Sequence, residues 1–333
     1  MNLQNEHLWK DRKVIITGGL GFIGSNLARR LVDYGAQVTL VDSLVPEYGG
    51  NLFNIEPIHD RSVVNISDVR DAHSLRHLVK GMDILFNLAG QTSHLDSMSD
   101  PQTDLDINCK SQLSILETCR KENPEIKVVF ASTRQIYGKP DYLPVDEKHS
   151  IRPVDVNGIN KVAGEQYHIL YNKVYGIKTT VLRLTNTYGP RMRIKDARQT
   201  FLGVWIKKIL AGEPFEVWEG EQLRDFTYVD DCVEALMQCA LSALADGRVF
   251  NLGGADEPVS LVRLAEMLIA ANGGVGSFER KNFPAERKAI DIGDYYSDMS
   301  LIQETVGWQP KVGLREGLEK SLNYFRSNLD KYL

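Results

Sequence analysis

The feature that most constrains the fold of this chain is a glycine-rich turn between an apolar run at 14–17 and an amphipathic stretch at 22–34. The turn carries glycine at positions 18, 21 and 24. Glycine has no Cβ atom, so the chain can turn tightly and its backbone N–H groups can reach a pyrophosphate at the start of a helix. The pattern favours a dinucleotide-binding α/β fold over a turn that only joins two elements.

Asp42 supports this interpretation and narrows the choice of cofactor. It stands at the end of the next apolar run, 37–41. A carboxylate there can accept hydrogen bonds from both ribose hydroxyls and would repel a 2′-phosphate. We therefore predict that the cofactor is NAD. The alternative is that Asp42 only caps a helix.

Short apolar runs alternate with amphipathic stretches through the first half of the chain, and after Pro190 the segments become shorter and more mixed. Near-continuous apolar strands that alternate with helices are typical of a parallel sheet covered on both faces. We predict an α/β, Rossmann-type, doubly wound sheet over 1–185, with a return segment near 226–252, and a smaller C-terminal α/β region over 186–333. The expected strands are 13–17, 37–41, 83–88, 127–131 and 178–184, and the expected helices are 22–34, 75–80, 104–121, 162–174 and 201–211.

Composition argues against several classes of partner. The 333 residues include 39 basic and 44 acidic side chains, a net charge of −5, without a basic stripe that would bind nucleic acid or an anionic membrane. The polar start of the chain lacks the apolar core of a signal peptide, and no apolar run approaches the roughly 18 residues of a membrane span. The four cysteines form no CxxC pair, which favours free thiols over disulfides or a metal site. We expect a cytoplasmic protein without a metal.

A series of short motifs runs along almost the whole chain. They are TGGxGFIG at 17–24, DVRD at 68–71, LAG at 88–90, an asparagine at 108, STxxxYG at 132–138, a lysine at 161, RxxNxYGP at 183–190, RDFxYVDD at 224–231 and GWxP at 307–310. In this set and order the chain resembles the extended short-chain dehydrogenases/reductases, the family of NAD-dependent nucleotide-sugar epimerases and dehydratases. The resemblance implies bound NAD and a nucleoside-diphosphate sugar, the latter held mainly by 186–333. It also implies a homodimer through the helices near 104–121 and 162–174, which on the sequence alone could equally cover a monomer.

The resemblance also implies roles for individual side chains. The ligand would be bound by Gln91, Arg134, Asn186, Arg224 and Arg287, since arginine forks suit phosphate oxygens. The alternative for Arg224 is a surface ion pair. The alternative for Arg287 is that it is only one of several basic side chains crowded in the same loop. The cofactor would be bound by Gly18, Gly21, Phe22, Ile23, Gly24, Asp42, Asp68, Val69, Leu88, Ala89 and Lys161.

Two positions depart from the family pattern, and the first is Asn157. It stands four residues before Lys161, where the family has a tyrosine. In the family that tyrosine, with its pKa lowered by the lysine, takes the proton of a sugar hydroxyl that a neighbouring threonine, here Thr133, orients. An asparagine amide cannot exchange a proton at any accessible pH. We predict that Asn157 orients the substrate and that Thr133 and Lys161 keep their family roles.

The second departure is Arg134-Gln135, directly after Thr133. Dehydratases of the family carry an Asp-Glu pair here, the sugar-acid decarboxylases keep the Glu, and epimerases have small residues. The lack of carboxylates disfavours elimination of water. Arg134 would either face a ligand anion, such as a sugar carboxylate, or lie on the surface.

Another group must therefore move the proton. His94 follows the strand expected at 83–88, and histidine changes its protonation near neutral pH, so it is the first candidate, with a structural hydrogen bond as the alternative. Asp155 and Asp96 come next, and both could cap helices instead. The sequence favours an NAD-dependent epimerase with a non-standard proton relay. A catalytically impaired NAD and nucleotide-sugar binder with a regulatory or scaffolding role comes second, and a dehydratase third.

Overall fold

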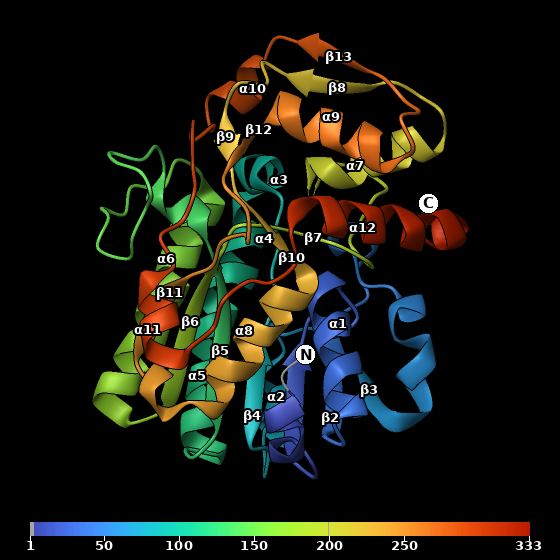
Figure 1. Cartoon of the computed structure of the whole chain (residues 1–333). Coiled ribbons are helices and arrows are strands. Elements are labelled where there is room, and N and C mark those ends of the chain that lie inside the picture. Colours follow the sequence, from blue (N-terminus) through green and yellow to red (C-terminus); the bar gives the residue numbers. More distant parts are fainter. Residues whose placement is uncertain (1–2, 199) are drawn as a thin grey trace.

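The centre of the molecule is a parallel sheet of seven strands (Figure 1). The structure is a computed structural model and describes residues 3–198 and 200–333. The strands are β1 (Lys13–Thr17), β2 (Gln37–Asp42), β3 (Ser62–Ile66), β4 (Ile84–Asn87), β5 (Lys127–Thr133), β6 (Lys178–Leu184) and β11 (Arg248–Asn251). Their spatial order is β11-β6-β5-β4-β1-β2-β3, which confirms the predicted doubly wound α/β fold. The chain reverses its direction of travel between β1 and β4, and such sheets bind ligands outside the carboxyl ends of their strands at this reversal.

Helices cover both faces of the sheet, so its inner strands are buried on both sides. Val14 and Ile16 belong to one hydrophobic core and Ile15 to the other, because successive strand residues point to opposite faces. None of the described helices is long and apolar enough to cross a membrane. One helical layer contains α1 (Phe22–Asp33), α8 (Val229–Leu241) and α11 (Ser300–Val306), and the other contains α2 (Ala72–Leu78), α5 (Ser111–Glu122) and α6 (Val156–Tyr175).

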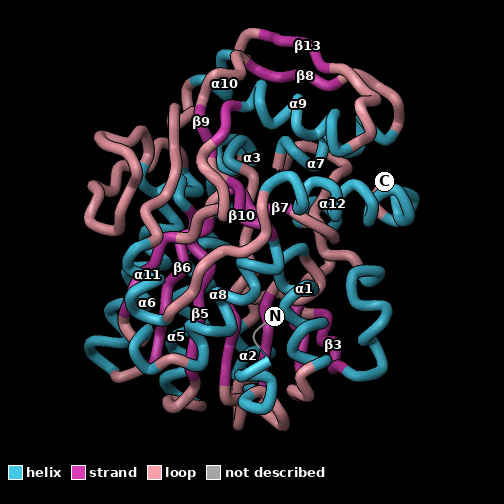
Figure 2. The backbone as a smooth tube through the Cα atoms, in the orientation of Figure 1, coloured by secondary structure: helices cyan, strands magenta, loops and turns pink. Residues whose placement is uncertain are grey.

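A smaller lobe lies over the carboxyl edge of the sheet (Figures 1 and 2). Trp205, Phe215 and Leu264 of this lobe belong to the same hydrophobic core as Val14 of the sheet. The lobe is therefore packed continuously onto the sheet. Its helices are α7 (Phe201–Leu210), α9 (Leu261–Ala271), α10 (Ala285–Lys288) and α12 (Leu314–Asn328), and its strand pairs are β7 (Asn186–Tyr188) with β10 (Phe226–Tyr228), β9 (Leu223–Arg224) with β12 (Val259–Ser260), and β8 (Phe215–Trp218) with β13 (Phe278–Lys281).

Three of the differences between the structure and the sequence-based expectation concern the sheet and the helices at the cavity. β3 was not expected, because as an edge strand it leaves Val63 and Ile66 exposed and lacks an apolar run. The helix expected at 104–121 is interrupted: α4 (Pro101–Leu105) ends in a π-helical turn (Asp106–Lys110) before α5 begins. α6 begins six residues earlier than expected (162 − 156 = 6), because Asp155 caps it by accepting a hydrogen bond of 2.6 Å from Gly158 N.

A buried ion pair fastens α6 to the sheet. Arg183 of β6 donates to the Glu165 carboxylate of α6 from Nε and Nη2, at 3.1 and 2.8 Å, and the two side chains are 4% and 0% exposed. Arg183 Nη1 also donates to Tyr137 OH at 2.7 Å. Because α6 carries Asn157 and Lys161, this pair helps to hold two expected site residues in place.

Replacing one member of this pair should be costly. Arg183→Met leaves the buried Glu165 carboxylate without its ion-pair partner, and we expect the free energy of unfolding to fall by about 3–5 kcal/mol. The double variant Arg183→Met/Glu165→Met should recover most of that loss, because it removes both charges. Urea unfolding followed by circular dichroism measures the difference. Arg152→Gln, which breaks an exposed pair with Asp141, is the control and should cost less than about 1 kcal/mol; a similarly small loss for Arg183→Met would show that the buried pair does not fasten α6 to the sheet.

Candidate functional site

The glycine turn after β1 has the close packing that a pyrophosphate site needs. Gly18 has a φ of +68°, and a Cβ atom there would lie 3.0 Å from Ala89 N. A Cβ atom on Gly24 would lie 2.2 Å from Gly18 O. Gly21 caps α1 without a side-chain hydrogen bond, so no capping side chain satisfies the first N–H groups of the helix. The turn therefore fits the pyrophosphate of NAD.

The expected cofactor residues lie along one edge of the sheet. Asp42 closes β2, and burial raises the pKa of its carboxyl group even though backbone N–H groups donate to both oxygens. Asp68, just beyond β3, accepts hydrogen bonds from Arg70 Nε and Nη2 at 2.9 and 2.6 Å, which hold the pKa of Asp68 below its usual range. The remaining expected positions follow β1, β3 and β4 at their carboxyl ends: Gly18, Gly21, Phe22, Ile23, Gly24, Val69, Leu88 and Ala89.

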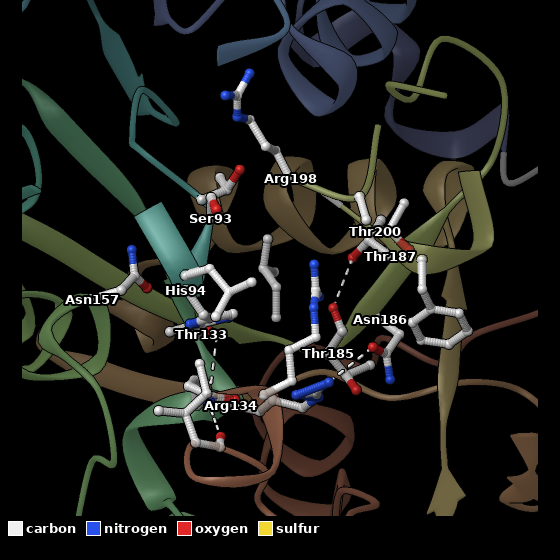
Figure 3. Close-up of a pocket in the computed structure, with 18 of the residues that line it drawn as sticks. Ser93, His94, Thr133, Arg134, Asn157, Thr185, Asn186, Thr187, Arg198 and Thr200 are labelled. Atoms are coloured by element: carbon white, nitrogen blue, oxygen red, sulfur yellow. Dashed lines mark hydrogen bonds between the residues drawn. The ribbon is translucent and has the colours of Figure 1, made fainter. Parts of the chain in front are cut away.

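A cavity of about 720 Å³ opens between this edge and the lobe (Figure 3). Its size suits a small-molecule ligand. Among the described residues, no group of three or more histidine, cysteine or acidic side chains is arranged to hold a metal. The cavity brings together the expected residues Phe22, Ile23, Leu88, Gln91, His94, Thr133, Arg134, Asn157, Lys161, Asn186, Arg224 and Arg287.

Asn157 is held by a buried carboxylate that the sequence motifs did not single out. Asp104 of α4 is 0% exposed and accepts hydrogen bonds from the side-chain amides of Asn157 at 3.0 Å, Asn108 at 3.0 Å and Asn160 at 2.8 Å. The Asn157 and Asn108 amides also donate to Gln91 O, each at 2.9 Å. These four side chains, the Asp104 cluster, join α4, the π-helical turn and α6 behind the cavity wall.

The Asp104 cluster determines what Asn157 offers to the cavity. The Asp104 carboxylate and the Gln91 carbonyl can only accept hydrogen bonds, so the Asn157 NH₂ group must face them. The carbonyl oxygen is then the polar atom of Asn157 left for a ligand. An amide in this orientation can accept a hydrogen bond from a ligand hydroxyl, in keeping with the predicted orienting role.

Lys161 lies one helical turn beyond Asn157, at the wall of the same cavity. Its Nζ donates to Ala131 O at 3.1 Å and lies 5.0 Å from the centre of the Phe130 ring. Burial lowers the pKa of Lys161 to about 8, although the nearby Asp104 and Glu165 carboxylates oppose this effect. The side chain therefore loses its positive charge as the pH rises through about 8.

His94 and Asp155 form a pair at the cavity wall. His94 Nδ1 lies 2.9 Å from Asp155 Oδ2, an ion-pair contact without the angle of a linear hydrogen bond, and the side chains are 35% and 0% exposed. Gln135 Nε2 donates to the same Asp155 oxygen at 3.0 Å. Burial acts to raise the pKa of Asp155, but the contacts with His94, Gly158 and Gln135 outweigh it and lower that pKa. A charged carboxylate therefore faces the imidazole.

The residues expected to hold the ligand differ in their freedom to do so. Arg134 Nη2 donates to Asn186 Oδ1 at 2.8 Å (Figure 3). Arg224 Nη2 pairs with Asp291 at 3.1 Å, and its Nη1 donates to the Gly293 carbonyl, so a diphosphate would have to compete with Asp291 for this guanidinium. Arg287 stacks on the Trp218 ring, with its Cζ 4.8 Å from the ring centre.

Sequence reasoning missed Asp104 and gave Gln135 no role. A signal for the first was present, because Asp104 and Asn108 are four residues apart and Asn157 and Asn160 three apart, so each pair shares a helix face. Nothing in the sequence indicates that these two faces meet. The link from Gln135 to Asp155 likewise depends on how the end of β5 lies against the start of α6.

A second carboxylate in the Asp104 cluster should make stability depend on pH. Asn157→Asp would place two carboxylates about 3 Å apart, where like charges raise the pKa of the pair above the unfolded value near 3.9. A raised pKa in the folded state means that the variant keeps its stability below about pH 4. As the pH rises through the raised pKa, the free energy of unfolding should fall by on the order of 1–3 kcal/mol. Thermal melting between pH 4 and 8, against the wild type at each pH, measures this loss.

Asn160→Asp is the matched control, because Asn160 also donates to Asp104 but does not line the cavity. The stability of both variants should fall as the pH rises, and only Asn157→Asp should also weaken ligand binding. A melting temperature of Asn157→Asp that follows the wild type at every pH would show that the two side chains are not in contact.

Comparison with known proteins places the chain in a family. Residues 14–253 match the family model "NAD dependent epimerase/dehydratase family". A putative UDP-glucose 4-epimerase of Methanocaldococcus jannaschii is 33% identical over 320 residues, which cover 95% of this chain and 99% of the relative. UDP-glucuronate 4-epimerase 4 of Arabidopsis thaliana is 30% identical over 338 residues, covering 94% of this chain and 75% of the relative.

Solved structures agree with the sequence relatives. UDP-glucose 4-epimerase of Thermotoga maritima, determined with UDP-glucose, superposes with a TM-score of 0.87 at 29% identity and covers 95% of this chain and 99% of its own. UDP-glucuronic acid 4-epimerase of Bacillus cereus, in complex with UDP-glucuronic acid and NAD, has a TM-score of 0.84 at 26% identity, with coverage of 95% and 99%. This chain belongs to the NAD-dependent epimerase/dehydratase family, as its motifs predicted, and its cofactor is NAD.

Proposed function

We propose that this protein is an NAD-dependent epimerase that inverts a hydroxyl-bearing carbon of a UDP-linked hexose. The observation that carries the proposal is the convergence of Thr133, Lys161 and the His94–Asp155 pair on one cavity beside the glycine turn. The similarity to UDP-sugar 4-epimerases supports UDP as the nucleotide and the 4-position as the reacting carbon.

The chain's own residues would orient the sugar and move its proton. Bound NAD supplies a reversible acceptor for the hydride of the reacting carbon. Thr133 Oγ1 accepts a hydrogen bond of 3.2 Å from Gln135 N, which leaves its own hydrogen free to donate to the sugar oxygen. The Asn157 carbonyl oxygen can accept from a sugar hydroxyl, and Lys161 would hold the cofactor ribose, as its position in the family implies.

The His94–Asp155 pair is the group we assign to the proton. A carboxylate beside Nδ1 favours the tautomer that carries its hydrogen on Nδ1, so Nε2 keeps a lone pair. Nε2 can take the hydroxyl proton as the hydride leaves the carbon, and the buried Asp155 stabilises the imidazolium that results. The proton returns from Nε2 to the sugar oxygen when the hydride returns to the opposite face of the carbon.

The catalytically impaired binder is the competing function, and Asn157 is its strongest support, because an amide at the position of the family's tyrosine cannot take a proton. A dehydratase is less compatible with the cavity. Gln135 is engaged with Asp155, and Arg134 cannot donate a proton to a leaving hydroxyl. Turnover of a UDP-sugar would exclude the impaired binder, and turnover without loss of water would also exclude the dehydratase.

Removing the proposed base should slow turnover strongly and leave binding intact. We expect His94→Gln to lower the rate of UDP-sugar epimerisation by about 10²–10⁴-fold, the range for loss of a general base. Proton NMR of the sugar measures turnover, and calorimetry measures binding of NAD and the UDP-sugar. His77→Gln, an exposed change on α2, is the control and should behave as wild type. Full turnover by His94→Gln would refute this assignment, whereas tight binding without turnover by the wild type would favour the impaired binder.

We also propose that the protein forms a homodimer through α5 and α6. The outer side of α6 leaves Ile159, Leu170 and Val174 56%, 49% and 57% exposed, and Leu113 of the adjacent α5 is 37% exposed. Exposed apolar side chains on two packed helices are typical of an interface.

Charges on this surface should separate the subunits. We expect Leu170→Asp/Val174→Asp to shift the mass in solution from twice to once 37.5 kDa, as measured by light scattering, because a buried carboxylate without a partner is unfavourable. Val63→Asp changes an equally exposed side chain (62%) on the opposite edge of the sheet and should leave the dimer intact. A wild type that is monomeric at micromolar concentration would contradict the proposal.

A further inference from the structure

We propose that Arg134 binds a carboxylate on the sugar ring, so that the substrate is a nucleotide-linked sugar acid. This inference rests on the proposed function and specifies its substrate. It starts from the position of Arg134, which directly follows Thr133 at the carboxyl end of β5 and lines the same cavity. Because Thr133 would hold the reacting hydroxyl, a side chain next to it lies within reach of the other substituents of the same ring.

The Arg134 guanidinium has hydrogen-bonding capacity that the protein does not use. Nη2 donates to Asn186 Oδ1 at 2.8 Å, and the Cζ atom lies 5.4 Å from the centre of the Tyr295 ring. Nε is buried and has no hydrogen-bond partner. A buried donor without an acceptor is unfavourable, and an arginine presents its N–H groups as a planar fork that matches the two oxygens of a carboxylate.

Its charge also has no ion-pair partner. In the part of the chain that the structure describes, no carboxylate lies within ion-pair distance of Arg134. Asp225 is the acid with the strongest electrostatic effect on it, but its oxygens accept hydrogen bonds from Thr185 Oγ1 and Ser297 N. Burial lowers the pKa of Arg134 for the same reason, since a desolvated cation without a counter-ion is disfavoured.

Two other arginines that line the cavity, unlike Arg134, have carboxylate partners. Arg224 pairs with Asp291 and donates to two backbone carbonyls. Arg198 pairs with Asp96 and Asp196. The negative charge of a ligand would gain little from these neutralised side chains and more from Arg134.

A carboxylate on the ring accounts for this arrangement better than a neutral hydroxymethyl group. Two coplanar oxygens can accept from Nη1 and from the second hydrogen of Nη2 at the same time. A hydroxymethyl group offers one oxygen and no charge, so the guanidinium would stay buried and unpaired. Recognition that leaves a buried polar group unsatisfied discriminates strongly against the wrong ligand.

A pair of ligands that differ at one carbon tests the proposal directly. UDP-glucuronate and UDP-glucose differ only in whether C6 is a carboxylate or a hydroxymethyl group. With NAD-loaded protein and calorimetry, we expect the wild type to bind UDP-glucuronate about tenfold or more tightly than UDP-glucose. Arg134→Gln should remove this preference and change the affinity for UDP-glucose by less than about threefold. Arg280→Gln, on the outside of the lobe and paired with Glu221, is the control and should keep the preference.

The remaining outcomes overturn the inference in distinguishable ways. A wild type that binds both ligands equally would refute the carboxylate site and leave the epimerase proposal standing. If Arg134→Gln lost the same amount of affinity for UDP, UDP-glucose and UDP-glucuronate, the arginine would be assigned to the diphosphate instead. No binding of any UDP ligand by the wild type would count against the proposed function as well. The wild-type comparison needs no variant, so the test holds even if Arg134→Gln does not fold.

Discussion

The buried carboxylate of Asp104 is the constraint on which the arrangement of the cavity wall depends. A carboxylate at 0% exposure must be fully satisfied, and here three asparagine amides donate to it. Two of the amides come from the start of α6 and one from the π-helical turn, so the requirement holds these segments together. Lys161 lies on the same helix one turn further on, and its position relative to the cofactor turn follows from this contact.

The two departures from the family pattern are connected through neighbouring side chains. Asn157 is one of the donors to Asp104, and its loss of acid–base chemistry comes with an amide fixed in one orientation. Gln135 stands where the motifs predict an acidic residue for a dehydratase and a small one for an epimerase, and it donates to Asp155, which faces His94. In the proposed function, the histidine–carboxylate pair takes the role of the family's phenol from a different place on the same cavity.

The charges around the cavity are distributed unevenly, and this bears on the ligand. Arg224, for which the sequence left phosphate binding and an ion pair open, pairs with Asp291. Arg134 is left without a counter-ion and with a buried N–H that has no acceptor. Among the described residues, Arg134 is thus one of the cavity's cations that lack an ion pair, and it lies beside Thr133, where the sugar would react.

The sequence by itself determined the fold, the cofactor and the family, because these depend on local patterns. A glycine turn after an apolar run, an acidic residue at the next strand end and alternating strands and helices can all be recognised along the chain. The edge strand β3 and the start of α6 were not predicted. An edge strand is half exposed, and Asp155 starts a helix through residues of low helix propensity. Only the tertiary structure decided the partners of the site residues. The contacts of Asp104 with Asn157, of His94 with Asp155 and of Arg224 with Asp291 join residues 53, 61 and 67 positions apart (157 − 104, 155 − 94 and 291 − 224). Such pairs depend on how elements pack, and no local pattern encodes them.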